Sequence, residues 1–154
     1  MLLAVHFLHI AAGVFWAGGA LFLALVLYPS IAAGSGMVAA NVLARISRVS
    51  GLALGSAGGL TMLLGLARAW TSGAIAGFGD ILSTYGVLVI VAFLMAGILD
   101  SRIKAARKDL EALSQNCDAF QAKAPARARR FAIEAPVLIT AILVIMVVLG
   151  MGAY

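Results

Sequence analysis

The first stretch of the chain, residues 2–29, is apolar almost throughout and carries no charged side chain. A helix needs about 20 consecutive apolar residues to cross the hydrocarbon core of a bilayer. The stretch also exceeds the roughly 7–15 apolar residues of a cleavable signal peptide, and no basic segment precedes it. We therefore expect a membrane-spanning helix that remains in the mature protein.

Three more apolar segments follow, and the composition agrees with a membrane protein. Of the 154 residues, 64% are hydrophobic and 11% are charged, which is far more apolar than a soluble domain of this size requires. The sequence predicts an all-α integral membrane protein, an antiparallel four-helix bundle that forms one domain over residues 1–154. The expected spans are about 2–29, 46–70, 80–100 and 132–152.

Turn and capping residues predict where these helices begin and end. Pro29 is expected to end the first helix, and Ser35 is expected to cap the second. Asp80 is the expected cap of the third helix, which should continue past the membrane into water to about Leu113. The segment Ser114–Ala126 is polar and contains a proline, so it predicts a loop before the fourth helix.

The distribution of positive charge predicts the orientation. All lysines and arginines except Arg68 lie at the end of the bundle that holds the first and third connections. By the positive-inside rule this end is cytoplasmic, and helices two, three and four extend into the cytoplasm. We therefore expect a multi-pass protein of a cell inner membrane with both termini in the periplasm, and we read its net charge of +5 as a sign of orientation and not of nucleic-acid binding.

Both histidines of the chain, His6 and His9, lie in the first span. On a helix they share one face with Gly13, Trp16 and Ala20. Ionisable groups are costly inside a membrane, so they usually face other helices and often mark a functional site. We expect this face to form one wall of such a site.

The second and third helices offer the opposite walls. Gly51, Gly55 and Gly59 are spaced by four, a pattern that permits close helix packing or leaves room for a flat macrocycle. Tyr85 lies at the outer start of the third helix, at the expected depth of His9. A cofactor would therefore sit near the outer end, between the first three helices.

The few possible ligands exclude several classes of site. Two histidines, one cysteine and few carboxylates cannot form a hydrolase triad or a three-histidine zinc site, and there is no phosphate-binding loop. A haem held by a histidine between helices is compatible, and so is a copper site made of His6, His9 and methionine. The histidines could equally serve as hydrogen-bond partners of a neighbouring helix. Because His6 and His9 share a face, they cannot both be axial ligands of one haem. A second ligand would have to come from another helix, or the iron would be five-coordinate with an open position.

Several motifs, taken in order, resemble a known family. In the first helix, a histidine is followed seven residues later by a tryptophan, and then by small residues and an aromatic residue. The expected second helix has a basic residue near its start and a Gly-Leu pair near its end. A Glu-x-Pro motif lies where the fourth helix enters the membrane. These are His9, Trp16, Gly18, Gly19, Phe22, Arg48, Gly65, Leu66, Glu134 and Pro136. This order is similar to that of the HemJ-type protoporphyrinogen oxidases and the related copper-resistance D membrane proteins.

The resemblance implies a haem b protein with His9 as an axial ligand and a redox role of the protoporphyrinogen oxidase type. It also implies an electron donor or acceptor in the membrane or periplasm. HemJ-like proteins carry a lysine near the outer start of helix three, where this chain has Tyr85 instead. The resemblance therefore leaves Tyr85, a methionine or no residue as the sixth ligand of the haem iron. Copper binding or transport, and a non-catalytic role as an accessory subunit of a respiratory membrane complex, are the alternatives. Association into a homo-oligomer or a larger complex stays open.

Overall fold

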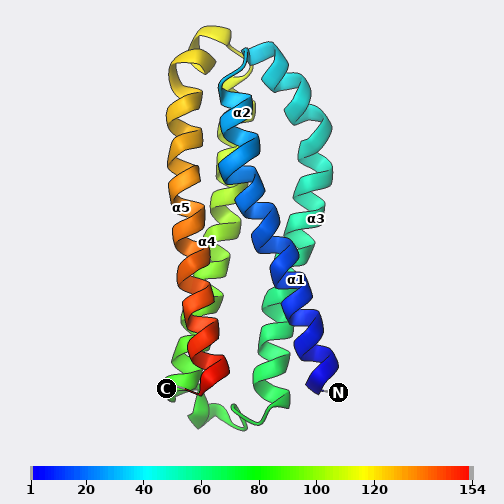
Figure 1. Ribbon diagram of the computed structural model, residues 1–154, viewed down its shortest axis with the longest axis vertical. Helices are drawn as coiled ribbons and strands as arrows, with labels where there is room; N and C mark the ends of the chain where they lie inside the picture. The colour runs from blue at the N-terminus through cyan, green and yellow to red at the C-terminus, as the bar shows by residue number, and fades with distance from the viewer. Residues whose placement is uncertain (1, 153–154) are drawn as a thin grey trace.

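The computed structural model describes residues 2–152, and every regular element within them is helical. Four long helical rods lie side by side with alternating direction, so the first and last described residues lie at the same end of the bundle (Figure 1). Each rod is long and apolar enough to cross a membrane. The predicted fold class, an all-α four-helix membrane bundle, is confirmed. The elements are α1 (Leu2–Phe22), η1 (Leu23–Leu27), α2 (Tyr28–Ala32), α3 (Gly36–Thr71), η2 (Phe78–Leu82), α4 (Thr84–Leu113) and α5 (Cys117–Met151).

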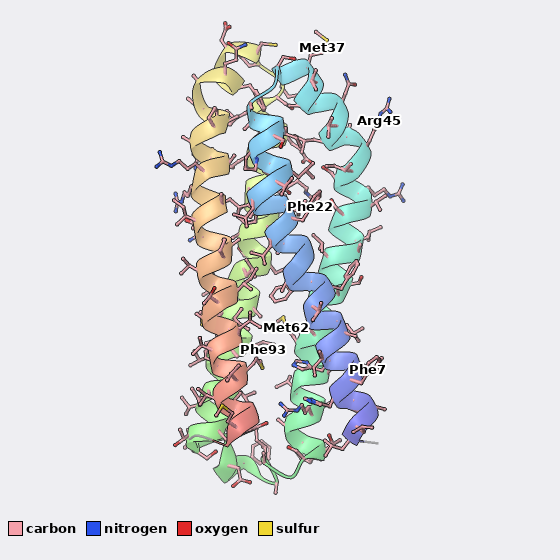
Figure 2. All side chains as sticks on the ribbon, viewed as in Figure 1. Phe7, Phe22, Met37, Arg45, Met62 and Phe93 are labelled. Carbon is pink, nitrogen blue, oxygen red and sulfur yellow. The ribbon has the colours of Figure 1, made fainter. Side chains whose placement is uncertain are left out.

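Large apolar side chains cover the outside of the rods. Phe7, Leu63, Leu94 and Val144 are all more than half exposed, and Figure 2 shows Phe7 directed away from the bundle. In water such a surface would be unfavourable, whereas hydrocarbon solvates it. Buried side chains, among them Trp16, form the core between the rods.

The first rod continues past Pro29 to Ala32, so the predicted end at Pro29 was wrong. The five residues before Tyr28 form a π-helical turn, η1, in which the Tyr28 N–H donates to the Leu23 carbonyl. A proline ring crowds the carbonyl four residues earlier and cannot donate to it. The wider π-helical turn lies where this crowding occurs, so the helix passes the proline without ending.

The caps of α3 and α4 are both serines. Ser35 Oγ accepts from the Val38 N–H at 3.4 Å, which confirms its predicted role. For α4 the prediction of Asp80 was wrong, because Ser83 Oγ caps the helix by accepting from the Gly86 N–H at 3.1 Å. The Asp80 carboxylate instead accepts from two N–H groups of the preceding loop, those of Ala76 and Gly77, both at 2.9 Å. The predicted end of this helix at Leu113 is confirmed.

The last helix, α5, begins at Cys117, so the predicted loop over Ser114–Ala126 was wrong. Asn116 caps the helix, and its Oδ1 accepts from the Ala119 N–H at 3.0 Å. Pro125 lies inside the helix and is exposed. The opposite side packs into the core through buried residues spaced by four, four and three, which are Phe120, Ala124, Ala128 and Phe131.

Removing the cap of α5 should destabilise the protein measurably. Asn116→Ala leaves the first N–H groups of the helix without this acceptor, which costs about 0.5–2 kcal/mol at typical N-caps. We expect the midpoint of denaturation in detergent, followed by circular dichroism, to fall. The matched control is Gln115→Ala, because Gln115 is exposed and precedes the cap. Equal midpoints for the two variants would contradict the role of Asn116.

The rods are not packed evenly, and this unevenness creates the candidate site. α1 packs mainly on α3, and α4 packs mainly on α5, while α2 returns against α5 through the rings of Tyr28 and Phe131, whose centroids are 5.7 Å apart. Figure 1 shows the first rod crossing the bundle, close to α5 where α2 lies and close to α3 at its amino end. Near the two termini, α1 and α5 therefore separate.

Candidate cofactor site

The histidine face of α1 meets a face of α3 that is made of small residues. A side chain on Gly65 would lie 3.1 Å from the His9 ring, and one on Gly58 would lie 2.7 Å from Trp16 Nε1. Midway between them, Gly13 faces the Thr61 methyl group. The absence of side chains at Gly58 and Gly65 thus lets the two large rings lie directly on the α3 backbone.

A hydrogen bond fixes the protonation of the His9 ring. His9 Nδ1 lies 2.9 Å from the backbone carbonyl oxygen of Thr61. A carbonyl can only accept, so Nδ1 must carry the proton and donate it. In the neutral ring Nε2 then keeps its lone pair. Metal-binding histidines in proteins are oriented in this way, because the ring nitrogen that does not bind the metal donates to a nearby acceptor.

Two spaces adjoin the His9 ring. The first is an internal cavity of about 60 Å³ between α1, α3, α4 and α5, and Met62 and Phe93 lie on it within the half of the bundle near the termini (Figure 2). Tyr85 of α4 also lines it, so Tyr85 and His9 border the same cavity. A cavity of this size has room for a few waters at most.

The second space is a groove of about 510 Å³ between α1 and α5, with α3 behind it. His6, His9 and Trp16 line it from α1, and Met146 lines it from α5. Its size falls within the range of about 300–1,000 Å³ that is typical of small-molecule and cofactor sites. The groove is mainly apolar, and exposed side chains such as Val14 and Val147 border it, so it opens toward the lipid.

Three polar groups at this groove have unused hydrogen-bonding or charge capacity. Within residues 2–152, His6 Nδ1 and Trp16 Nε1 are buried and make no hydrogen bond. Arg68 lines both the cavity and the groove and forms no ion pair with any described residue. Buried donors and an unpaired half-buried cation are costly unless a ligand or water meets them.

The predicted site residues fall into two groups. His6, His9 and Trp16 lie together on the groove, as the helix face predicted. Tyr85 shares only the internal cavity with His9, and Gly55 and Gly59 line neither space. A side chain on either of these two glycines would meet nothing within 4 Å, whereas Gly58 and Gly65 carry the contact with α1.

Sequence reasoning missed Gly58 and Arg68, although a signal for the glycine was available. His9 and Trp16 are seven residues apart, and so are Gly58 and Gly65. Equal spacing on two antiparallel helices places two rings opposite two glycines at once. Within the described residues no group of three or more His, Cys, Asp and Glu side chains gathers, so a metal here would rely on imidazole and thioether ligands.

Comparison with known proteins adds no relatives. No family model matches the sequence, and neither a curated protein nor a solved structure is significantly similar to it.

Proposed function

We propose that this chain is a haem b-binding integral membrane protein with a redox role of the HemJ-like type, and that His9 is an axial ligand of the haem. The observation that carries the proposal is the His9–Thr61 hydrogen bond, because it leaves Nε2 as the ligating nitrogen beside a cofactor-sized groove. Haem iron in proteins is commonly held by a histidine in this way, and it would supply one-electron chemistry.

The residues of the groove fit such a ligand. Gly18 and Gly150 line the groove, and the space next to each is open, because an added side chain would meet nothing within 4 Å. Its apolar lining suits a macrocycle, and Arg68 and His6 near the outer end can hold carboxylates. Trp16 also lines the groove, whereas its N–H is buried against Gly58 of α3.

The dimensions favour the groove between α1 and α5 over the predicted place between the first three helices. An internal cavity of about 60 Å³ is too small for a macrocycle, and Tyr85 lines that cavity without lining the groove. Met146 lines both spaces. We therefore favour Met146, or an open position, over Tyr85 opposite His9.

Copper binding is the second candidate, and one observation favours it. His6, His9 and Met146 line the same groove, and imidazole and thioether are ligands that copper accepts. Copper would use two histidines of one face, whereas haem would use one of them axially. A copper-binding or copper-transport protein is therefore the alternative reading of the same side chains.

One measurement separates these proposals. The protein should be purified in mild detergent from cells supplied with haem and copper, and its absorption spectrum recorded oxidised and reduced, alongside metal analysis. Haem binding predicts a Soret band and one iron per chain. A colourless preparation that contains stoichiometric copper would contradict haem binding and support the copper proposal. A preparation that contains neither haem nor copper would contradict both proposals.

We further propose the inner-membrane orientation with both termini in the periplasm, since the arginines and lysines other than Arg68 gather at the opposite end. Cys117 is exposed at that basic end. A membrane-impermeant maleimide should therefore label it in inverted vesicles and not in intact cells. The control is Gly79→Cys in a Cys117→Ser background, because Gly79 is exposed in η2, which lies in the connection at the opposite end, and a side chain there meets nothing within 4 Å. Labelling of Cys117 in intact cells would contradict the orientation.

A further inference from the structure

A second cavity lies at the other end of the bundle, between the first rod, α3 and α4. Its volume is about 240 Å³, and it shares no lining residue with the groove beside His9. The π-helical turn η1 contributes Leu23 to its wall, and Tyr28 follows directly. Turns of this kind often mark functional sites inside helices.

The lining of this cavity has an excess of positive charge. Arg48, Lys104 and Arg107 line it, and the carboxylate among its lining residues, Asp100, is already paired with Lys104 at 2.6 Å. Arg107 Nη1 donates to the Ser47 carbonyl at 2.9 Å, while its Nε is buried without a hydrogen-bond partner among residues 2–152. Arg48 forms no ion pair within the described chain. Lys104 is thus neutralised by Asp100, and Arg107 is paired with the nearby Glu111. Arg48 remains as the cation without a counter-charge at this cavity.

The Tyr28 hydroxyl adds a neutral donor. Tyr28 is 2% exposed, yet it lines the cavity. Its hydroxyl makes no hydrogen bond with any residue that the structure describes. The ring is buried, but the hydroxyl oxygen is not among the buried polar atoms that lack a partner, so it can donate to a group bound in the cavity. Guanidinium and hydroxyl donors around one space suit an oxyanion with several acceptor oxygens.

The apolar side of the cavity continues along α3. Gly55 lines it, and Gly59 follows one helical turn later on the same face. A side chain on either glycine would meet nothing within 4 Å. Leu52 on the same face is 68% exposed, so Gly55 and Gly59 lie at the lipid-facing surface. The open space above Gly55 and Gly59, hereafter the channel, gives an acyl chain room beside the cavity.

From these contacts we propose that the cavity binds a phosphate group, with Arg48, Arg107 and Tyr28 as its donors. An anionic phospholipid is the source that the channel favours, because its acyl chain would lie on Gly55 and Gly59 while its headgroup enters the cavity. Basic pockets between transmembrane helices bind lipid headgroups by this chemistry. The site is independent of any cofactor at His9.

The test measures the melting temperature of the full chain in dodecyl maltoside against ligand concentration, which yields an apparent affinity. Phosphatidylglycerol, zwitterionic phosphatidylcholine and sodium phosphate are titrated separately, the last against chloride of equal ionic strength. We expect phosphatidylglycerol to stabilise the protein more than phosphatidylcholine does. Arg48→Gln should weaken its affinity about five-fold, as expected for one basic residue near a headgroup. Tyr28→Phe should weaken it as well, with little change in packing.

Arg45→Gln is the matched control, since Arg45 lies one turn earlier on α3 and points away from the bundle (Figure 2). It should leave the affinity unchanged. Gly55→Leu distinguishes the two sources of phosphate, because it should block the lipid and spare inorganic phosphate. If inorganic phosphate stabilises the protein, and Gly55→Leu does not change this effect, the cavity is a phosphate site whose ligand is soluble. Equal losses in Arg48→Gln and Arg45→Gln, or no preference for phosphatidylglycerol and no effect of phosphate, would overturn the proposal.

Discussion

His9→Ala should abolish the Soret band of the purified protein, and the bound iron should fall to background. The substitution removes the nitrogen that the Thr61 hydrogen bond leaves free for a metal, and His6 Nδ1 makes no such hydrogen bond with any described residue. The apolar contacts of the groove remain, but without a ligand to the iron they should not hold haem through purification. Reduced and oxidised spectra, taken with the iron content per chain, measure the loss.

Three controls separate ligation from folding in this experiment. Phe7→Ala changes an exposed side chain of the same helix and should leave the spectrum as it is. His6→Ala should weaken or shift the band without removing it, because His6 would contact the edge of the ligand. Adding imidazole to His9→Gly should restore a band if the histidine is an axial ligand. Full occupancy in His9→Ala, with unchanged circular dichroism, would refute the assignment.

The same spectra distinguish the groove from the internal cavity. Met146→Leu should alter the reduced spectrum or the reduction potential if Met146 lies opposite His9, because a thioether ligand raises the potential. Tyr85→Phe should leave both unchanged, since Tyr85 does not line the groove. Loss of a phenolate charge-transfer band in Tyr85→Phe would instead return the haem to the region between α1, α3 and α4.

The fold was predictable because lipid imposes a simple requirement on each segment. Backbone groups in hydrocarbon must be paired within the segment, so an apolar run of sufficient length becomes a helix. The cap at Ser35 and the end of α4 at Leu113 followed from local composition in the same way. Where the chain leaves the membrane, this requirement disappears. There the polar composition around Pro125 concealed the buried spacing that runs from Phe120 to Phe131, and the start of α5 was missed.

The site was predictable on one helix and not on its neighbour. His9 and Trp16 stand out because a polar ring in an apolar run has few uses, and their common face is buried as expected. Which face of α3 meets them depends on the rotation of that helix about its axis, and local sequence does not fix this rotation. Neighbouring helical residues differ by about 100°. The sequence prediction named Gly59 as a site residue, but Gly59 faces the lipid side, and its neighbour Gly58 is the residue that faces Trp16.

These two neighbouring glycines give the sharpest test of the packing between α1 and α3. A methyl group on Gly58 would lie 2.7 Å from Trp16 Nε1, which is closer than van der Waals contact allows, while one on Gly59 would meet nothing. Overpacking of this kind typically costs about 1–3 kcal/mol. Replacing an unconstrained helical glycine by alanine gains about 0.5–1 kcal/mol instead.

We therefore expect Gly58→Ala to lower the midpoint of denaturation in detergent and Gly59→Ala to leave it unchanged or raise it. Both variants change the helix propensity of α3 by the same amount, so their difference isolates the contact with Trp16. Adding Trp16→Phe to Gly58→Ala should recover part of the loss, because the smaller ring frees space above residue 58. Equal midpoints for the two alanine variants would mean that α3 presents another face to α1. The small-residue surface beneath His9 and Trp16 would then have to be reassigned.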